Sequence, residues 1–484
     1  MSSSAVRPIS SPVVIPNFAT LWQSMPGATA LKRRLIRGLA GGLLLFGASS
    51  VVAWSDHASL VWPLVRVLPD LTDQSVPAET LESFVKAESE GLARMLEAQE
   101  QWSRRHLADY RKRPSSLRFD PRSQRPVTDF LEAIRVNPTL EYPLYRQLTS
   151  EDRLEDAGRL QFSDLSFLTP GVSHREVEYV PLLPGQAVAV AHVVASASDE
   201  PDFGIDVGLF SDNQTAFGAR YGFGPQPFGN PNLDYGSQAP FHMGFYHLDW
   251  LVRTVQPQLL QTYPAWRIAL YERLAQFAFD TGHPYWGWRF AGWALHYIGD
   301  LTQPYHAQPL PGVSTMKALW LVVSGGTADA IQLVSNRHGV LESYQHQRLT
   351  RPMQQGQWSD PLLQTIAEPE EVPSYHWSII RGALTASSVA AGAGLDTRLE
   401  TTMPVHLVSD PSFEWVGSGL ESELIERLEA EVGADAMAEF DQTLMQQMGR
   451  FSRYARAWLQ WTLAAQETAE KKDAQGDGNP VLGP

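Results

Sequence analysis

The chain has 484 residues and contains no cysteine. Disulfides are therefore excluded, and so are metal sites built on thiolates. A metal ion in this protein would have to be held by imidazole, carboxylate or backbone groups. Positive charge is also scarce, because 38 lysines and arginines stand against 53 acidic residues and give a net charge of −15. That balance argues against nonspecific binding to a polyanion, although a local metal cluster could override it.

The sequence shows no internal repeat and no second block of composition that would mark another domain. With 43% hydrophobic residues, the chain can bury a large core. Helical periodicity predicts a long amphipathic helix over residues 78–112 and a short helix over 127–137. After Pro264 the pattern is mostly helical to about Glu470, and residues 471–484 read as a disordered tail.

Two stretches in the middle of the chain are less regular. The run that follows Pro184 is rich enough in alanine for a helix, although its valines also allow a strand. Residues 203–240 are rich in Gly, Phe, Pro and Asn, and this composition predicts an ordered aromatic loop.

The first 53 residues contain no acid and five bases, which are Arg7, Lys32, Arg33, Arg34 and Arg37. An uncharged run, Gly38–Ala53, follows the bases and ends in the small residues Val51-Val52-Ala53. This order predicts an export signal that is cleaved after Ala53, so that the protein is periplasmic or secreted. An uncleaved anchor in the inner membrane is the alternative, and the sequence does not distinguish Sec from twin-arginine export.

One stretch, "WALHYIGDLTQPYHAQP" at 293–309, contains several residues that could bind a metal ion or transfer a proton. His296 and Asp300 are four residues apart and would lie on one face of a helix. Pro304 cannot continue that helix, so it can turn the chain and bring His306 back towards the same cavity. Three interpretations compete for these residues: a buried polar patch, a proton relay and a metal site.

Other stretches supply further candidate ligands. In "NRHGVLESY", residues 336–344, His338 and Glu342 again stand four apart on a predicted helix. Upstream, "SDEPDFGID" supplies Asp202, with Asp206 as its competitor, and "SQAPFHMGFYH" supplies His242. Cleavage after Ala53 would make Trp54 a free N-terminus three residues before His57.

The stretch "LHYIGDLTQPYHA" resembles the signature of the bacterial zinc-dependent phospholipases C, a family with a distant branch in the zinc-dependent single-strand nucleases of fungi and plants. This resemblance implies an all-α fold: a single multi-helix catalytic domain over residues 54–470, with insertions at about 105–180 and 309–335. It also implies three zinc ions held by nine residues. Their counterparts here, in the family order, are Trp54, His57, Asp202, His242, His296, Asp300, His306, His338 and Glu342.

The resemblance also implies how the ligands are shared. Asp202, His242, His296 and Asp300 would hold one ion, His306, His338 and Glu342 a second, and Trp54, His57 and Asp300 the third. Imidazole and carboxylate without sulfur suit zinc. Asp300 would bridge two ions, Asp202 would double as the base that orients a water molecule, and Phe203 would contact the substrate. The expected reaction is hydrolysis of a phosphodiester.

The preferred phosphodiester is a separate question. A phospholipase C would act on a phospholipid at a membrane surface, and phosphatidylcholine or phosphatidylethanolamine are the expected substrates. The apolar run "ALWLVV" at 318–323 is either a helix packed in the core or a surface that dips into lipid. A single-strand nuclease would stack bases on aromatic side chains, for which the candidates are Phe203, Phe210, Tyr221, Phe223 and Phe228. The acidic charge disfavours nucleic acid. A non-catalytic zinc-binding surface protein is the third alternative.

Overall fold

The computed structural model describes residues 56–149, 151–152, 158–231 and 233–475. The predicted export signal and the predicted ligand Trp54 lie outside these residues. Within them the protein is mostly helical, which confirms the all-α class. No helix of this part of the chain is both long and apolar enough to cross a membrane.

The first half of the chain contains short helices and the strands. The helices are α3 (His57–Val65), α4 (Pro69–Thr72), α5 (Leu81–Ala87), α6 (Ser89–His106), α7 (Pro126–Ala133), α8 (Val172–Arg175), α9 (Val190–Asp199) and α10 (Asp234–His242). The strands form two antiparallel pairs, β1 (Ser75–Pro77) with β4 (Ala187–Ala189) and β2 (Tyr145–Gln147) with β3 (Tyr179–Pro181). These pairs are too short to form a layer of their own.

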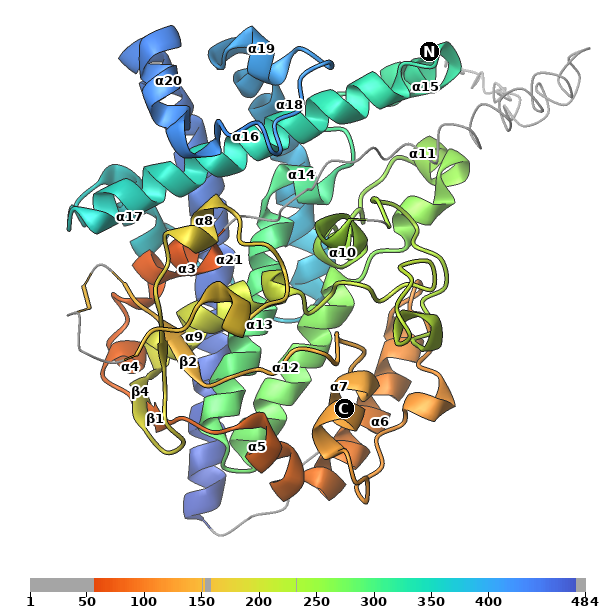
Figure 1. Cartoon of the computed structure of the whole chain (residues 1–484), viewed down its shortest axis with the longest axis vertical. Coiled ribbons are helices and arrows are strands. Elements are labelled where there is room, and N and C mark those ends of the chain that lie inside the picture. Colours follow the sequence, from red (N-terminus) through yellow and green to blue (C-terminus); the bar gives the residue numbers. More distant parts are fainter. Residues whose placement is uncertain (1–55, 150, 153–157, 232, 476–484) are drawn as a thin grey trace, which may run out of the picture.

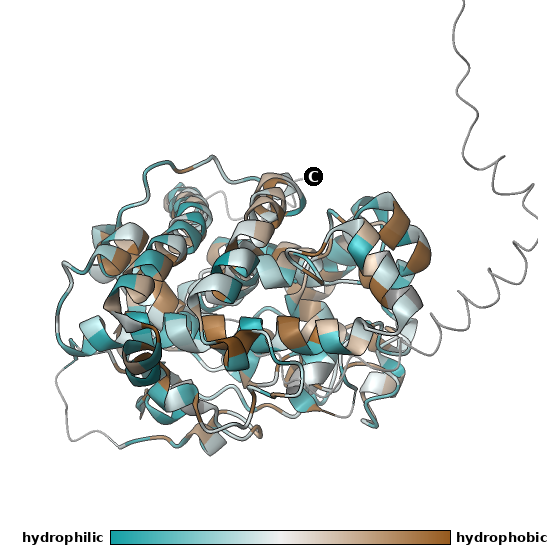
Figure 2. Cartoon of the chain, turned by 90° about the horizontal axis from the view of Figure 1, so that it is seen from above, coloured by the Kyte–Doolittle hydropathy of each residue, from teal (hydrophilic) through white to brown (hydrophobic). Residues whose placement is uncertain are grey.

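The second half contains the longer helices. They are α11 (Trp250–Val255), α12 (Pro264–Asp280), α13 (Pro284–Thr302), α14 (Pro304–Ala307), α15 (Thr315–Ser324), α16 (Thr327–Gln354), α17 (Pro361–Ala367), α18 (Thr385–Thr402), α19 (Val405–Val408), α20 (Leu424–Glu431) and α21 (Gly433–Ala474). Figure 1 shows α12, α13 and α21 running side by side through the molecule, with α16 crossing near one end of them. Most helices carry both hydrophilic and hydrophobic residues (Figure 2), as expected of helices that share a core.

Helix α13 is the centre of this arrangement. It begins at Pro284, whose fixed φ suits the first turn, and every residue from Tyr285 to Thr302 is buried. A helix that is buried on all sides must be covered on all sides. Here α12, α9 and α21 cover it, and the indole Nε1 of Trp458 on α21 donates a hydrogen bond to the carbonyl of Ala291.

Three predicted elements differ in detail from the structure. The predicted helix over residues 78–112 is two helices, α5 and α6, which meet at Glu88. Helix α6 ends at His106 because the following chain folds back, and the Tyr110 hydroxyl donates a hydrogen bond to the Glu100 carboxylate at 2.5 Å. The run after Pro184 is both elements that the sequence allowed, a strand and then a helix, β4 and α9. Helix α21 continues to Ala474, so the start of the predicted tail is helical.

A glycine allows α9 and α13 to approach closely. A Cβ atom added at Gly292 would lie 2.6 Å from the Cβ of Ala197 and 2.9 Å from the carbonyl oxygen of Val194. Real Cβ atoms do not come this close to another atom, so only glycine fits between the two helices. The contact matters for the site, because α9 leads directly into the segment that carries Asp202.

We therefore expect Gly292→Ala to lower the free energy of unfolding by about 1–3 kcal/mol, since it forces two packed helices apart. Gly394→Ala is the matched control, because Gly394 lies in α18 with no atom within 4 Å of the added Cβ. That change should stabilise the protein by about 0.4–1 kcal/mol. Urea denaturation of both variants measures the difference, and equal stability would contradict the close contact.

Candidate metal centre

His296 and Asp300 lie one turn apart on α13, and neither side chain is exposed. The Nδ1 atom of His296 lies 2.7 Å from the carbonyl oxygen of Ser198. A carbonyl can only accept, so Nδ1 carries the proton and Nε2 presents its lone pair. This lone pair faces Asp300, with 3.4 Å between Nε2 and Oδ2. The backbone of α9 thus fixes the tautomer that can bind a metal ion.

Pro304 turns the chain after α13, as its position in the sequence predicts. Helix α13 ends at Thr302, Gln303 is extended, and Pro304 opens the short helix α14. His306 on α14 therefore returns to α13, where its Nδ1 lies 3.3 Å from Asp300 Oδ1. The same Nδ1 donates to the carbonyl of His242 at 3.1 Å, so Nε2 of His306 is also left as an acceptor.

Asp300 is the hub of four histidines. Besides His296 and His306, it contacts His242 at the end of α10, with Nδ1 2.9 Å from Oδ2. It also lies near His57, the first residue of α3, with 3.5 Å between Nε2 and Oδ1. These imidazoles come from four separate helices, and Asp300 is where their side chains converge.

The second predicted pair forms an adjacent group. His338 and Glu342 lie one turn apart on α16, with Nε2 2.7 Å from Oε1. The Nε2 atoms of His306 and His338 face each other at 3.1 Å, and Gln303 donates to the Glu342 carboxylate at 3.0 Å. Gln303 is a contact that the sequence analysis did not assign, although it stands inside the quoted motif.

Asp202 and Asp206 have different surroundings. Asp202 lies in the short helix η3 (Glu200–Phe203), 3.8 Å from His242 Nδ1 and 3.9 Å from His296 Nε2. Its Oδ2 atom has no hydrogen-bond partner among the described residues. Asp206 is instead bound by the guanidinium of Arg267 and by the hydroxyl of Tyr297. Asp202 is therefore the carboxylate with an oxygen free for a metal ion.

Eight of the nine predicted ligands thus lie together, and the ninth, Trp54, falls outside the described residues. Within this part of the chain, ligand atoms less than 4.8 Å from one another form three groups, each able to hold a metal ion. The groups are His57, Asp202 and His296; His242, His296 and Asp300; and His306, His338 and Glu342. The last is the set expected for the second ion. His57 joins Asp202 and His296, although it was expected to share an ion with Asp300.

The centre gathers three buried carboxyl groups without a lysine or arginine beside them in the described part of the chain. Asp202, Asp300 and Glu342 are at most 4% exposed, and among the described residues none forms an ion pair with lysine or arginine. Several polar atoms also lack hydrogen-bond partners there, including both ring nitrogens of His57 and Oδ1 of Asp300. Burying carboxylates without a counter-charge is costly. Bound cations would remove that cost, so these residues fit metal ions.

Burial sets the protonation state of three of the imidazoles. It lowers the pKa of His57, moves the pKa of His296 well below the usual range, and brings the pKa of His338 to about 3. All three are therefore neutral at pH 7, which is the form of histidine that binds metals.

Asp202 and His242 hold protons at neutral pH. Burial raises the pKa of Asp202 to about 8, because the charged carboxylate is poorly solvated. Burial alone would lower the pKa of His242, but the Asp300 carboxylate beside it outweighs this and raises the pKa to about 9. A cation that binds these two side chains must displace their protons.

Phe203, the predicted substrate contact, is only 3% exposed. Its ring packs edge-on against Phe162, His174 and Tyr179 in a small hydrophobic cluster. The other aromatic residues considered for base stacking, Phe210, Tyr221, Phe223 and Phe228, are also buried. In this conformation none of these five rings offers an open face to a substrate.

His346 has a structural role that could not be assigned from the sequence. It follows Glu342 by one helical turn on α16, and its Nδ1 lies 3.3 Å from Oδ2 of Asp56. Asp56 has a positive φ of 83°, which turns the chain, and it caps α3 by accepting from the backbone N–H of Ser59. His346 thereby holds the start of α3, where His57 lies, against α16. The spacing 338–342–346 was the signal that could have found it.

Gly299 is a second unassigned residue. A Cβ atom at this position would lie 3.1 Å from both Cε1 and Nδ1 of His57. The glycine before Asp300 therefore leaves the room in which the His57 ring lies.

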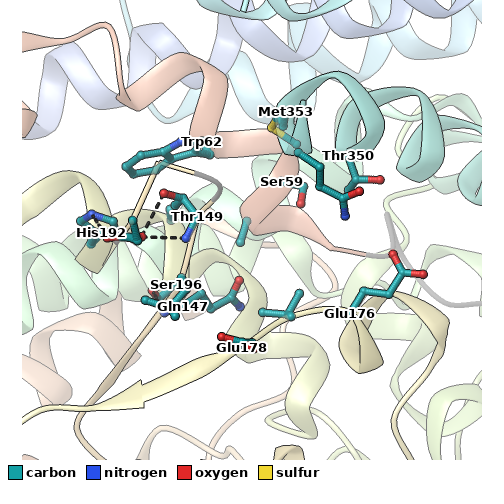
Figure 3. A pocket seen from close by; sticks show the side chains of 16 residues that line it. Ser59, Trp62, Gln147, Thr149, Glu176, Glu178, His192, Ser196, Thr350 and Met353 are labelled. Carbon is teal, nitrogen blue, oxygen red and sulfur yellow. Dashed lines mark hydrogen bonds and ion pairs between the residues drawn. The ribbon is translucent and has the colours of Figure 1, made fainter. Parts of the chain in front are cut away.

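Two cavities are lined in part by residues that lie close in sequence to a ligand. One, of about 250 Å³, lies against α3 beyond Ala58 and is lined by polar groups such as Gln147, Thr149 and His192 (Figure 3). The other, of about 370 Å³, is mostly apolar and begins at Gln308, two residues after His306.

Comparison with protein-family models, with curated proteins and with solved structures finds no match to this chain.

We expect Asp300→Asn to lose bound metal, because an amide removes the charge that four imidazoles share. Changes outside the coordination sphere alone cost about 10–100-fold in metal affinity, so this one should cost on the order of 100-fold or more. Metal analysis after dialysis measures the loss. His376→Ala is the control, since the His376 side chain is exposed and hydrogen-bonds to the hydroxyl of Ser378, away from the ligands. Equal metal content in both variants would refute the hub role of Asp300.

Zinc affinity should rise with pH between about 6 and 8, because the ion must displace the protons of Asp202 and His242. Each displaced proton changes the apparent affinity by about tenfold per pH unit below the pKa. Competition with a chelator at pH 6, 7 and 8 gives the slope. Asp202→Asn should make the slope shallower by about one proton, and a flat dependence in the original protein would contradict the assignment.

Proposed function

We propose that this protein is a zinc-dependent phosphodiesterase of the phospholipase C type, which cleaves a glycerophospholipid into diacylglycerol and a phosphorylated headgroup. The observation that carries the proposal is the set of three ligand groups, of which two share His296 and the third contacts Asp300 through His306. Isolated structural zinc sites need one group of four ligands, whereas adjacent ions a few ångströms apart are typical of phosphate-ester hydrolysis.

The ligands would hold zinc in the manner that the groups suggest, about three ions per mature chain with Trp54 completing the set. Bound zinc would supply positive charge for the phosphate oxygens and would lower the pKa of a water molecule. The protein's own residues do the positioning: the carbonyls of Ser198 and His242 orient two imidazoles, and Gln303 orients Glu342. Asp202 Oδ2 has no other partner and can accept the proton of the attacking water.

Hydrolysis forms a bond between phosphorus and the water oxygen and breaks the bond between phosphorus and the glycerol oxygen. Asp202 takes one proton from the water, and the glycerol oxygen leaves with a proton as an alcohol. Once a bound cation has displaced the resting proton of Asp202, the carboxylate can take the water proton and pass it on to the leaving glycerol oxygen.

Support for a lipid over a nucleic acid comes from the aromatic residues and the charge. The rings that could have stacked bases are buried, and the net charge of −15 repels a polyanion. The non-catalytic alternative is favoured by a different observation, the near-complete burial of every described ligand. Closed sites of this kind are typical of structural zinc.

One assay separates the three functions. The zinc-loaded protein is given phosphatidylcholine, phosphatidylethanolamine and single-stranded DNA in parallel, with chelated protein and Asp300→Asn as controls for contaminating enzymes. We expect release of diacylglycerol from a phospholipid, its loss on chelation, and no cleavage of DNA. Faster cleavage of DNA would show a nuclease. Stoichiometric zinc without turnover of any substrate would show a binding protein.

A further inference from the structure

The apolar cavity near the metal centre is a groove between two helices that each expose apolar side chains. Its walls come from α11 and the residues around it, and from residues 308–313, α15 and the first turns of α16. Figure 1 shows α11 and α15 on the same side of the molecule. Apolar residues such as Leu251, Val255, Leu310, Leu321 and Ile331 line it. We call this region, with Trp250, Met316 and Trp320, the α11–α15 face.

The groove lies close in sequence to two of the ligands. One wall contains Gln308 and Pro309, which directly follow α14 and its ligand His306. The other wall begins at His247, five residues after the ligand His242. Both walls are therefore built from chain segments that adjoin residues in contact with Asp300.

Three large apolar residues stand exposed around the groove. Trp250 is 72% exposed, Met316 73% and Trp320 65%. Each is a sequence neighbour of a residue in the groove wall, namely Leu251, Thr315 and Leu321. The alternative stated for the run at 318–323, core helix or lipid-facing surface, is thus decided for Trp320, which is not in the core. Tryptophan prefers the boundary between water and lipid, because its ring is apolar and its N–H is polar.

We propose that the α11–α15 face is a lipid-docking surface: its rim enters the outer layer of a bilayer, and its groove receives an acyl chain of the phospholipid. The proposal rests on the proposed function for the polar end of that lipid. A second copy of this chain fits the face less well, because each copy has a net charge of −15 and two copies repel one another.

The test uses the full-length, zinc-loaded protein and vesicles of phosphatidylcholine with phosphatidylethanolamine. The rim variant Trp250→Ser/Trp320→Ser changes only exposed side chains, and the groove variant Leu321→Asn places an amide in the apolar wall. The control is Leu183→Ser, which removes a side chain that is equally exposed, at 72%, on the turn between β3 and β4. Cosedimentation measures vesicle binding, and a short-chain phosphatidylcholine below its micellar concentration measures activity without a bilayer.

We expect the rim variant to bind vesicles at least tenfold more weakly, while its activity on the soluble lipid stays within twofold. The groove variant should lose activity on vesicles and raise KM for the soluble lipid, and Leu183→Ser should change neither. Equal vesicle binding by the rim variant and the original protein would overturn the proposal. So would absence of vesicle binding in the original protein, or a dimer in light scattering that the rim variant dissociates.

The failure of the proposed function looks different in this experiment. If the original protein binds vesicles through the rim but hydrolyses neither vesicles nor the soluble lipid, the docking surface stands and the phospholipase activity does not. If it hydrolyses the soluble lipid but the rim variant still docks, the activity stands and the assigned surface does not.

Discussion

Buried negative charge is the constraint on which the centre of this protein depends. The core handles its acids in two ways. Asp206 and Glu200 are paired with Arg267 and Arg289, so each carboxylate has a fixed cation within the protein. Among the described residues, Asp202, Asp300 and Glu342 have only imidazoles as basic groups beside them, and burial keeps three of these imidazoles neutral. Without a metal ion, this part of the core is balanced by the protons that Asp202 and His242 hold, and a bound cation would displace them.

The surrounding helices follow from that requirement. An all-buried helix, α13, brings Asp300 to the middle of the molecule, and the close contact at Gly292 places α9 beside it. The end of α9 then supplies the carbonyl that orients His296 and the short helix that carries Asp202. Each of the eight ligands that the structure describes lies in a regular element, which holds its direction more firmly than a loop would.

Much of the site could be predicted because the spacing of four residues and the turn at a proline are local rules. His296 with Asp300, His338 with Glu342, and the return of His306 needed only the geometry of one helix at a time. Contacts between distant segments could not be read in this way. The pairing of His346 with Asp56 spans 290 residues of sequence, and the burial of Phe203 depends on a cluster formed by the insertion before it. For the same reason, the hydrophobic periodicity of the sequence did not predict the break between α5 and α6 at Glu88. Nor did it predict that the alanine-rich run divides into the strand β4 and the helix α9.

The line of side chains along α16 has a consequence for how the sequence can change. His338, Glu342 and His346 share one face of a continuous helix. The spacing along α16 therefore fixes both the ligand pair of the metal centre and the residue that contacts the start of α3. One inserted residue between Glu342 and His346 would turn the latter by about 100° around the helix axis. It would then point away from Asp56. This stretch is therefore fixed in length as well as in composition.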